Sequence, residues 1–155
     1  MGQSLLDQQK RVQQNQQLYM LIQLQIQICK NKQDFNFYQN VSNITDLMLQ
    51  ADIAIGAAGT TTWERCCLGL PSLITAIADN QIEIGIEAEA MGIVKYLGIS
   101  DDVSTDDIAD ALSQITDQPE MLKAMSRRAI EKVDGKGAVR IASILKDRIT
   151  LGVTT

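Results

Sequence analysis

Residues 51–81 read "ADIAIGAAGTTTWERCCLGLPSLITAIADNQ" and contain two short apolar runs, each of which ends in small polar residues. The runs "DIAIG" and "PSLITAIA" predict two buried strands. The segment between them, "TTTWERCCLGL", predicts a helix that ends at Gly69 and Pro71. A strand–helix–strand order of this length is typical of a βαβ unit with parallel strands. The stretch therefore predicts an α/β fold with a parallel sheet flanked by helices.

The rest of the chain continues this alternation after a glutamine-rich N-terminal segment, residues 1–33. Its apolar spacing predicts an amphipathic helix from about residue 4 to residue 30, and the alternative is a Gln-biased leader that is partly disordered. We predict one domain over residues 34–150 and a short tail over 151–155. The other predicted elements are a strand at 34–40, helices at 42–51 and 80–92, a strand at 94–98 and three helices at 104–117, 119–135 and 137–149.

Composition limits the class of protein. Of the 155 residues, 45% are hydrophobic and 21% are charged, and the net charge is −5. The negative charge argues against a general nucleic-acid or anionic-membrane surface. No apolar run reaches the roughly 18 residues that span a bilayer, and the first residues do not lead into the apolar region of a signal peptide. Because three cysteines, two of them adjacent, do not form a secreted disulfide framework, we expect a reduced, cytoplasmic protein without a membrane span.

Histidine is absent from the sequence. This excludes, within these residues, hydrolases that rely on a histidine base, so any catalysis here would need carboxylates, lysine, tyrosine or backbone dipoles. The acidic stretch "SDDVSTDD" (100–107) has neither EF-hand spacing nor a glycine at the turn position. Acidic residues in a first helical turn are ordinary partners of the helix dipole. We therefore expect no metal, no other cofactor and no catalytic residue in this chain.

Two stretches of small polar residues, "IGAAGTTT" (55–62) and "AIADNQ" (76–81), follow the two predicted strands. If these strands are neighbours, both turns open at the same edge of the sheet, where ligands of such folds bind. The small residues leave the backbone bare, and the following helix presents unpaired N–H groups, which suit a phosphate or diphosphate. The alternative is an ordinary helix start, because a glycine-rich turn followed by threonine is common there.

Two residues of the following helix have both a binding and a structural interpretation. Glu64 could accept hydrogen bonds from a vicinal diol such as ribose. It also stands three residues after Thr61, which is the spacing of a capping box. Trp63 could stack on a base, although packing is the more common role of a partly buried tryptophan. Spacing alone does not separate these interpretations.

The second turn ends in Asp79, Asn80 and Gln81. Either Asp79 or Asn80 would be a normal N-cap of the next helix. Gln81, one step inside the helix, offers an amide to sugar hydroxyls. The cap and the ligand contact are equal alternatives at this turn.

The stretch around these turns resembles the C-terminal domain of the UDP-sugar hydrolases of the pseudaminic acid pathway and the related spore-coat polysaccharide biosynthesis proteins. The similarity runs from about Val41 to Leu145 and includes "ADIAIGAAG", "WERCCLGLPS", "ADNQ" and "VDGKGAVRI". These proteins have the GT-B architecture, two Rossmann-like domains facing across a cleft, shared with the N-acetylglucosaminyl transferase of peptidoglycan synthesis. The resemblance implies the Rossmann-like C-terminal half of such a fold, with an incomplete first βα unit.

The resemblance also implies a ligand, UDP or a UDP-sugar. The first turn would hold the diphosphate through N–H groups and hydroxyls, Glu64 would bind the ribose diol, and Asn80 and Gln81 would reach the sugar or the diphosphate. In the hydrolases, water attacks the sugar carbon of a UDP-linked 2,4-diacetamido-trideoxy sugar, with a histidine of the N-terminal domain as base. The predicted substrate-binding residues are Gly56, Ala57, Ala58, Gly59, Thr60, Thr61, Thr62, Glu64, Asn80 and Gln81.

This sequence departs from that family in two ways. It has no histidine, and the resemblance does not include the family's N-terminal domain. We therefore expect the nucleotide-binding half of a UDP-sugar hydrolase, inactive without an N-terminal catalytic half. The alternatives are one subunit of a two-chain GT-B glycosyltransferase and a non-catalytic remnant that binds a nucleotide or a partner. Since a missing half would leave an apolar face exposed, we also expect the chain to self-associate.

Overall fold

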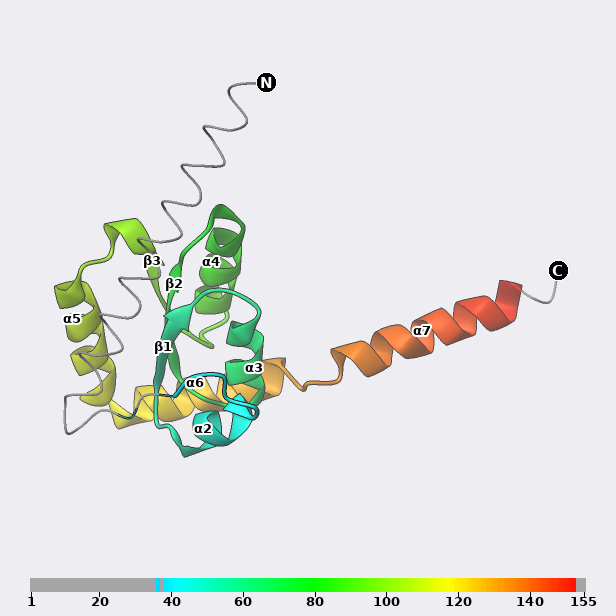
Figure 1. The fold of residues 1–155 in the computed structure, drawn as a ribbon, viewed down its shortest axis with the longest axis horizontal. Helices are drawn as coiled ribbons and strands as arrows, with labels where there is room; N and C mark the ends of the chain where they lie inside the picture. The colour runs from blue at the N-terminus through cyan, green and yellow to red at the C-terminus, as the bar shows by residue number, and fades with distance from the viewer. Residues whose placement is uncertain (1–35, 37, 153–155) are drawn as a thin grey trace, which may run out of the picture. The chain divides into compact units, whose positions relative to one another are not determined.

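The computed structural model describes residue 36 and residues 38–152. The chain divides into two compact units, Met1–Ser42 and Asn43–Thr155. The described helices and strands lie in the second unit (Figure 1). The helix predicted over about residues 4–30 lies outside the described residues, as do residues 153–155 of the predicted tail.

The described sheet has three parallel strands in the order β1–β2–β3. Ala54 of β1 pairs with Ser72 of β2, and Leu73 of β2 pairs with Lys95 of β3. The strands are β1 (Ala54–Ala57), β2 (Ser72–Ala76) and β3 (Lys95–Ile99). The helices are α2 (Ile44–Gln50), α3 (Thr61–Cys67), α4 (Ile82–Ala90), α5 (Thr105–Thr116), α6 (Pro119–Lys132) and α7 (Gly137–Gly152), with short 3-10 helices η1 (Asp79–Gln81) and η2 (Ser100–Asp102).

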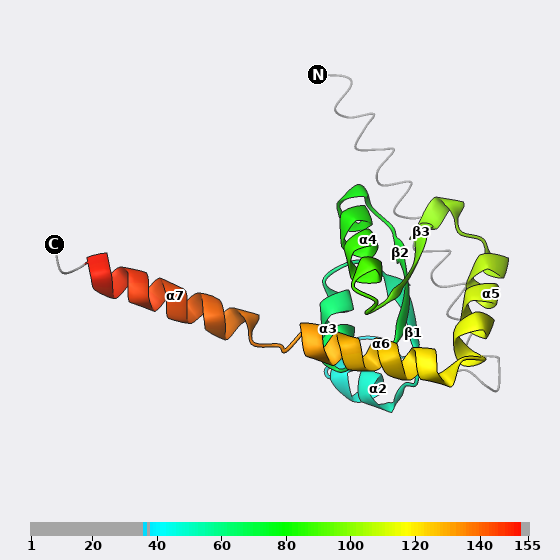
Figure 2. The ribbon, with the colours of Figure 1, turned by 180° about the vertical axis from the view of Figure 1, so that it is seen from behind.

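Helices cover both faces of the sheet. Neighbouring residues of β2 point to opposite faces, so the surroundings of Ile74 and Leu73 show what covers each face. Ile74 packs in a cluster with residues of α3, α4 and α6. Leu73 packs on the other side, in a cluster with residues of α5 and α6. Accordingly, α5 lies on one side of the sheet and α3 and α4 lie on the other in both views (Figures 1 and 2). The predicted α/β fold with a parallel sheet flanked by helices is confirmed.

The prediction of a strand over residues 34–40 is wrong for the residues of this stretch that the structure describes. Asn36 and Tyr38–Asn40 have no regular structure, and Asn40 has a positive φ of 54°. Alternation of apolar and polar residues favours a strand only where a neighbouring strand pairs with it, and β1 pairs with β2 alone in the described sheet. The remaining residues of this stretch lie outside the described part of the chain.

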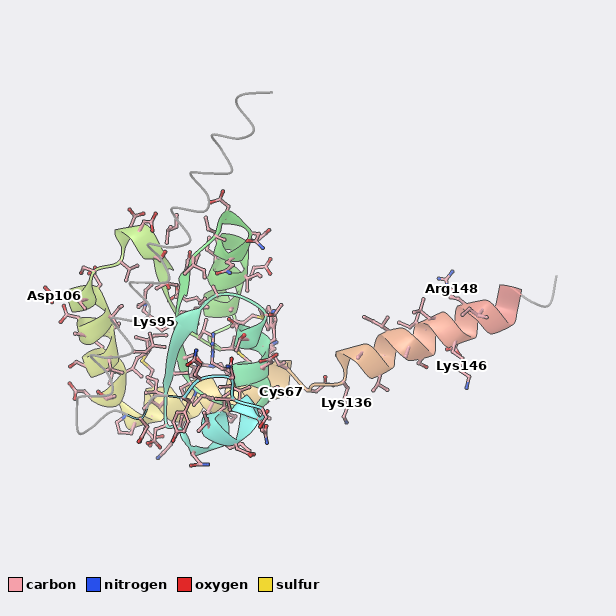
Figure 3. The ribbon with its side chains drawn as sticks, in the orientation of Figure 1. Cys67, Lys95, Asp106, Lys136, Lys146 and Arg148 are labelled. Atoms are coloured by element: carbon pink, nitrogen blue, oxygen red, sulfur yellow. The ribbon has the colours of Figure 1, made fainter. Side chains whose placement is uncertain are left out.

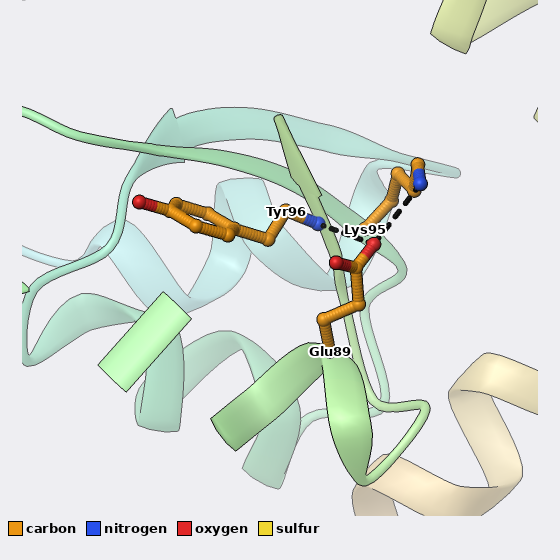
Figure 4. A network of polar contacts seen from close by, with 3 residues as sticks. All are labelled: Glu89, Lys95 and Tyr96. Atoms are coloured by element: carbon orange, nitrogen blue, oxygen red, sulfur yellow. Dashed lines mark hydrogen bonds and ion pairs between the residues drawn. The ribbon is translucent and has the colours of Figure 1, made fainter. Parts of the chain in front are cut away.

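A carboxylate at the end of α4 ties this helix to β3. Glu89 Oε1 accepts hydrogen bonds from Lys95 Nζ at 3.0 Å and from the Tyr96 backbone N–H at 3.3 Å (Figure 4). Gly85 lets the same helix approach the Tyr96 ring closely, since a Cβ at this position would lie 2.6 Å from two ring carbons. The aromatic ring thus requires glycine on the facing turn of α4.

The helix α7 exposes its apolar side chains. Ile141, Leu145 and Ile149 recur every four residues and therefore form one apolar stripe on a helix. They are 61%, 57% and 67% exposed. None of the helices that the structure describes is both long and apolar enough to cross a membrane.

A capping box starts α5. Ser104 Oγ accepts the Asp107 backbone N–H at 3.2 Å, and Asp107 Oδ2 accepts the Ser104 backbone N–H at 2.9 Å. The hydrogen bond from the Ser104 side chain is the main cause that lowers the pKa of the Asp107 carboxyl. A folded-state pKa below the unfolded value gives stability that is present above the unfolded pKa and is lost as the pH falls through the folded pKa.

We predict that Ser104→Ala lowers the free energy of unfolding by about 1 kcal/mol at neutral pH, because a helix N-cap is lost. The loss should shrink at acidic pH, where the Asp107 carboxylate is protonated in both variants. Urea denaturation at neutral and acidic pH measures both effects. Ser113→Ala, an exposed serine on the same helix, is the control, and an equal loss in the two variants would contradict the prediction.

We further predict that the chain self-associates through the α7 stripe, because exposed apolar area favours association. Light scattering should show an apparent mass that rises with protein concentration. Leu145→Lys should reduce this rise, whereas Ser143→Lys, which adds the same charge at another exposed position of α7, should leave it unchanged. A monomer at all concentrations in the unmodified chain would refute the prediction.

Candidate functional site

The turn between β1 and α3 leaves three consecutive backbone N–H groups open. Ala58 N donates to Thr75 O of β2 at 2.8 Å, and Thr62 N donates to Gly59 O at 3.0 Å. Between these two bonded groups, the N–H groups of Gly59, Thr60 and Thr61 have no hydrogen-bond partner in the described part of the chain. Successive free N–H groups in a turn are suited to an anion.

The predicted binding residues of this turn divide into an outer and an inner set. Thr60 is exposed and Thr61 is half-buried, so their hydroxyls are accessible. Ala58 and Thr62 are fully buried. The Thr62 hydroxyl donates to Ala57 O at 3.3 Å, so this side chain supports the turn from inside.

Arg65 is a buried residue of this site that the sequence interpretation missed. Its Nη2 donates to Ala57 O at 3.0 Å and to Thr62 Oγ1 at 3.1 Å. A Cβ at Gly56 would lie 2.9 Å from Arg65 Nη1. Gly56 therefore makes room for a guanidinium, whereas the sequence suggested that its bare backbone serves a ligand. The sequence signal of this arrangement is a Gly-rich strand end and an arginine about one turn inside the following helix, nine residues after Gly56.

The second turn meets the first through Gln81. Gln81 Oε1 accepts the Ile77 backbone N–H at 3.1 Å, which directs the side chain back across its own turn. Its Nε2 lies 3.5 Å from the position that a Cβ at Gly59 would occupy. The two turns therefore do open at the same edge of the sheet. Asn80 is exposed beside this contact and has no side-chain hydrogen bond to a described residue.

The cap interpretation of the second turn is wrong. The 3-10 helix η1 comes first, so the N-cap of α4 is Gln81, and neither Asp79 nor Asn80 caps a helix with its side chain. The residues of η1 already curve the chain into α4, which leaves the Asp79 and Asn80 side chains at the surface.

The capping box proposed for Thr61 and Glu64 is also absent. The N-cap of α3 is Thr60, in a helical conformation with φ −56° and ψ −33°, and no side chain caps this helix. A capping residue needs an extended backbone to turn its side chain toward the third helical N–H, and Thr61 is already the first residue of the helix. The Glu64 carboxylate is exposed and is free for another role.

Glu64 lines a groove of about 740 Å³ beside α3. Trp63 is half-buried, packs against the cluster around Ile74 and also lines this groove. The groove is also lined by Cys67, which follows Glu64 by about one helical turn and lies next to the segment that joins α6 to α7 (Figure 3). The remaining lining residues come from α2, α3 and the α6–α7 region: Ile44, Thr45, Met48, Leu68, Lys132, Val133, Asp134, Gly135, Gly137 and Arg140.

The groove and the turns do not share the same lining. The groove is lined by none of the residues Gly56–Thr62 and by no residue of η1. The open N–H groups lie at the start of α3, and Glu64 lies about one helical turn further along this helix. An extended ligand with an anionic part and a hydroxyl-bearing part would contact both. The acidic residues of 100–107 lie in η2 and α5, and the described residues include no group of three potential metal ligands.

The two cysteines of α3 differ in their surroundings. Cys66 is fully buried, and burial raises the pKa of its thiol to about 11, although the neighbouring Arg65 charge acts in the opposite direction. Cys67 is half-buried on the groove, where its Sγ would lie 2.9 Å from a Cβ at Gly135.

Comparison with known proteins gives a distant relative. No protein-family profile matches the chain. The chain is similar to the spore coat polysaccharide biosynthesis protein SpsG of Bacillus subtilis (strain 168), with 26% identity over 118 residues. The matched region is 76% of this chain and 35% of SpsG, so the chain spans about a third of the length of this curated relative. The match supports the resemblance to the spore-coat polysaccharide biosynthesis proteins.

We predict that a thiol reagent at pH 8 modifies Cys67 quickly and Cys66 only on unfolding, because thiolate is the reactive form and burial disfavours it. The third cysteine is first removed by Cys29→Ser. The reaction is then followed by the absorbance of the thiolate that the reagent releases when it modifies a cysteine. Cys67→Ser should remove the fast phase. Loss of the fast phase in Cys66→Ser instead would show that the burial assignment is wrong.

Proposed function

We propose that this chain binds UDP or a UDP-sugar and acts in polysaccharide biosynthesis. The observation that carries this proposal is the meeting of the two turns, at Gly59 and Gln81, beside three open N–H groups. A nucleotide diphosphate is an anion that such groups bind without a metal. The similarity to SpsG, which is named for spore coat polysaccharide biosynthesis, supports this choice of process.

In this proposal the diphosphate lies on the first turn. The N–H groups of Gly59, Thr60 and Thr61 donate to its oxygens, and the accessible hydroxyls of Thr60 and Thr61 add further donors. Gln81 and Asn80 lie on the neighbouring turn and reach the sugar or the second phosphate. The buried Thr62 and Ala58 contribute only to the shape of the turn.

The nucleoside extends along α3 toward the groove. Glu64 accepts hydrogen bonds from both ribose hydroxyls, since an ionised carboxylate offers two acceptor oxygens. No described residue competes for this carboxylate through a hydrogen bond. The apolar lining near Trp63 and Met48 is suited to the base.

The reaction that would follow binding is release of UDP from a 2,4-diacetamido-trideoxy sugar, as the resemblance to the hydrolases suggests. The sequence holds no histidine, so we assign the base of that reaction to an N-terminal GT-B half, a missing domain or separate chain. One subunit of a two-chain glycosyltransferase is the second candidate, because the same half of a GT-B fold would bind the same donor. A nucleotide-binding remnant without catalysis is the third.

We predict that UDP binds with a Kd of about 0.1 to 1 mM and that ATP and NAD do not bind in this range. Isothermal titration calorimetry measures all three. No heat with UDP at millimolar concentration would refute the proposal.

Glu64→Gln tests the ribose contact within the same experiment. Losing hydrogen bonds to a charged acceptor costs about 1.5 kcal/mol, or about tenfold in Kd. The variant should lose the preference for UDP over 2′-deoxy-UDP and keep the unfolding free energy, because Glu64 caps no helix. Glu83→Gln, an exposed glutamate of α4, gives the same change in charge and should bind as the unmodified chain does. If the ratio of the Kd values for UDP and 2′-deoxy-UDP is the same in the unmodified chain and in Glu64→Gln, Glu64 does not bind the ribose hydroxyl.

A further inference from the structure

Arg65 carries a charge that no acidic group of the described residues neutralises. Its side chain and backbone together are 6% exposed, and its Nε is one of the buried side-chain atoms without a hydrogen-bond partner. The ion pairs among the described residues join other residues: Lys95 with Glu89, Lys123 with Glu120, and Arg140 with Asp134. Burying an unpaired charge costs free energy until a partner compensates it.

The neighbouring carboxylate does not provide this compensation. Glu64 directly precedes Arg65, and side chains one residue apart on a helix point in different directions. Glu64 is exposed on the groove, whereas the guanidinium lies against Gly56 and Ala57. Burial lowers the pKa of the Arg65 guanidinium, and the opposing effects of Cys66 and Glu64 are smaller.

The buried charge lies on the inner side of the same turn that presents open donors outside. Arg65 Nη2 and the Thr62 hydroxyl both donate to Ala57 O, which fixes this carbonyl toward the interior. The N–H groups of Gly59, Thr60 and Thr61 follow directly, without partners in the described chain. An anion on the turn would therefore be attracted by the donors and by the charge behind them.

We propose that Arg65 is a positioning residue whose unpaired charge is compensated by the diphosphate of the bound nucleotide. This inference rests on the proposed function. Arg65 holds the Ala57 carbonyl and places a fixed positive charge behind the turn, and the ligand completes the pair. The same charge therefore has opposite effects on the two states, since it destabilises the free protein and stabilises the complex.

Arg65→Met separates this role from a purely structural one, because replacing an unpaired buried charge with an apolar side chain is often neutral or stabilising. Thr62 still donates to Ala57 O in this variant. The free variant should melt at the same or a higher temperature. It should bind UDP about tenfold more weakly, with a shallower dependence of Kd on salt, and bind uridine within about twofold of the unmodified chain. Calorimetry at low and high salt measures UDP, and ligand-observed NMR measures uridine.

Two further variants provide matched controls. Arg65→Lys keeps the charge and should retain most of the UDP affinity and its salt dependence. Arg127→Met makes the same substitution at an exposed arginine of α6 and should behave as the unmodified chain in every measurement.

Three results would overturn the inference. If Arg65→Met binds UDP as the unmodified chain does, the charge plays no part, although the proposed function stands. If Arg65→Met melts at a much lower temperature and loses UDP and uridine equally, Arg65 is structural only. If the unmodified chain binds no UDP, the proposed function fails, and the inference fails with it.

Discussion

The parallel pairing of β1 with β2 determines where the candidate site lies. This pairing continues one residue past the end of β1, through the bond from Ala58 N to Thr75 O. The bond holds the chain against β2 until it turns into α3, so Gly59 is the first residue released from the sheet. Gln81 returns to the same place because its side chain is held by the Ile77 N–H. One extra ladder hydrogen bond and one side-chain bond therefore bring together two turns that a whole helix and strand separate. Gln81 Nε2 lies 3.5 Å from the position that a Cβ at Gly59 would occupy.

The fold was largely predictable because its strongest signals are local. The runs "DIAIG" and "PSLITAIA" are short and almost continuously apolar, as central strands covered on both faces must be, and both lie where β1 and β2 form. The stretch "DFNFYQN" shows the limit of this reasoning. Its alternation is typical of a strand with one buried face, yet a strand also needs an edge that pairs with it. Sequence pattern describes the faces of a strand and gives no information about its neighbours.

The geometry of the candidate site was predictable only in outline, and its role in binding stays a prediction. Glycines and threonines after a strand marked the first turn, and the position of Gln81 marked the second. The capping-box spacing of Thr61 and Glu64 was misleading, because spacing does not fix the residue at which a helix begins. Arg65 escaped prediction for a different reason. An arginine on a short helix is usually exposed, and only the three-dimensional structure shows that Gly56 leaves room for its guanidinium.

The proposed anion site requires that a turn attract an anion in a chain with a net charge of −5, and Gly56 and Arg65 together provide a physical reason. The overall charge repels anions at long range, where salt screens it. At the turn, the interaction is with a charge that lies behind the backbone, where the effective dielectric constant is lower than in water and the attraction is therefore stronger. A lysine on the surface could not reproduce this effect, since its ammonium would be hydrated and mobile. In the proposed function, the turn binds the ligand and this sequence offers no histidine that could act as a base. A buried guanidinium stays protonated. The accessible groups of the candidate site are hydroxyls, amides, backbone N–H groups and the Glu64 carboxylate, and the proposed ribose contact occupies that carboxylate. In that proposal, binding and reaction belong to different parts of a GT-B fold: the charge of Arg65 retains the nucleotide, and a second half supplies the base.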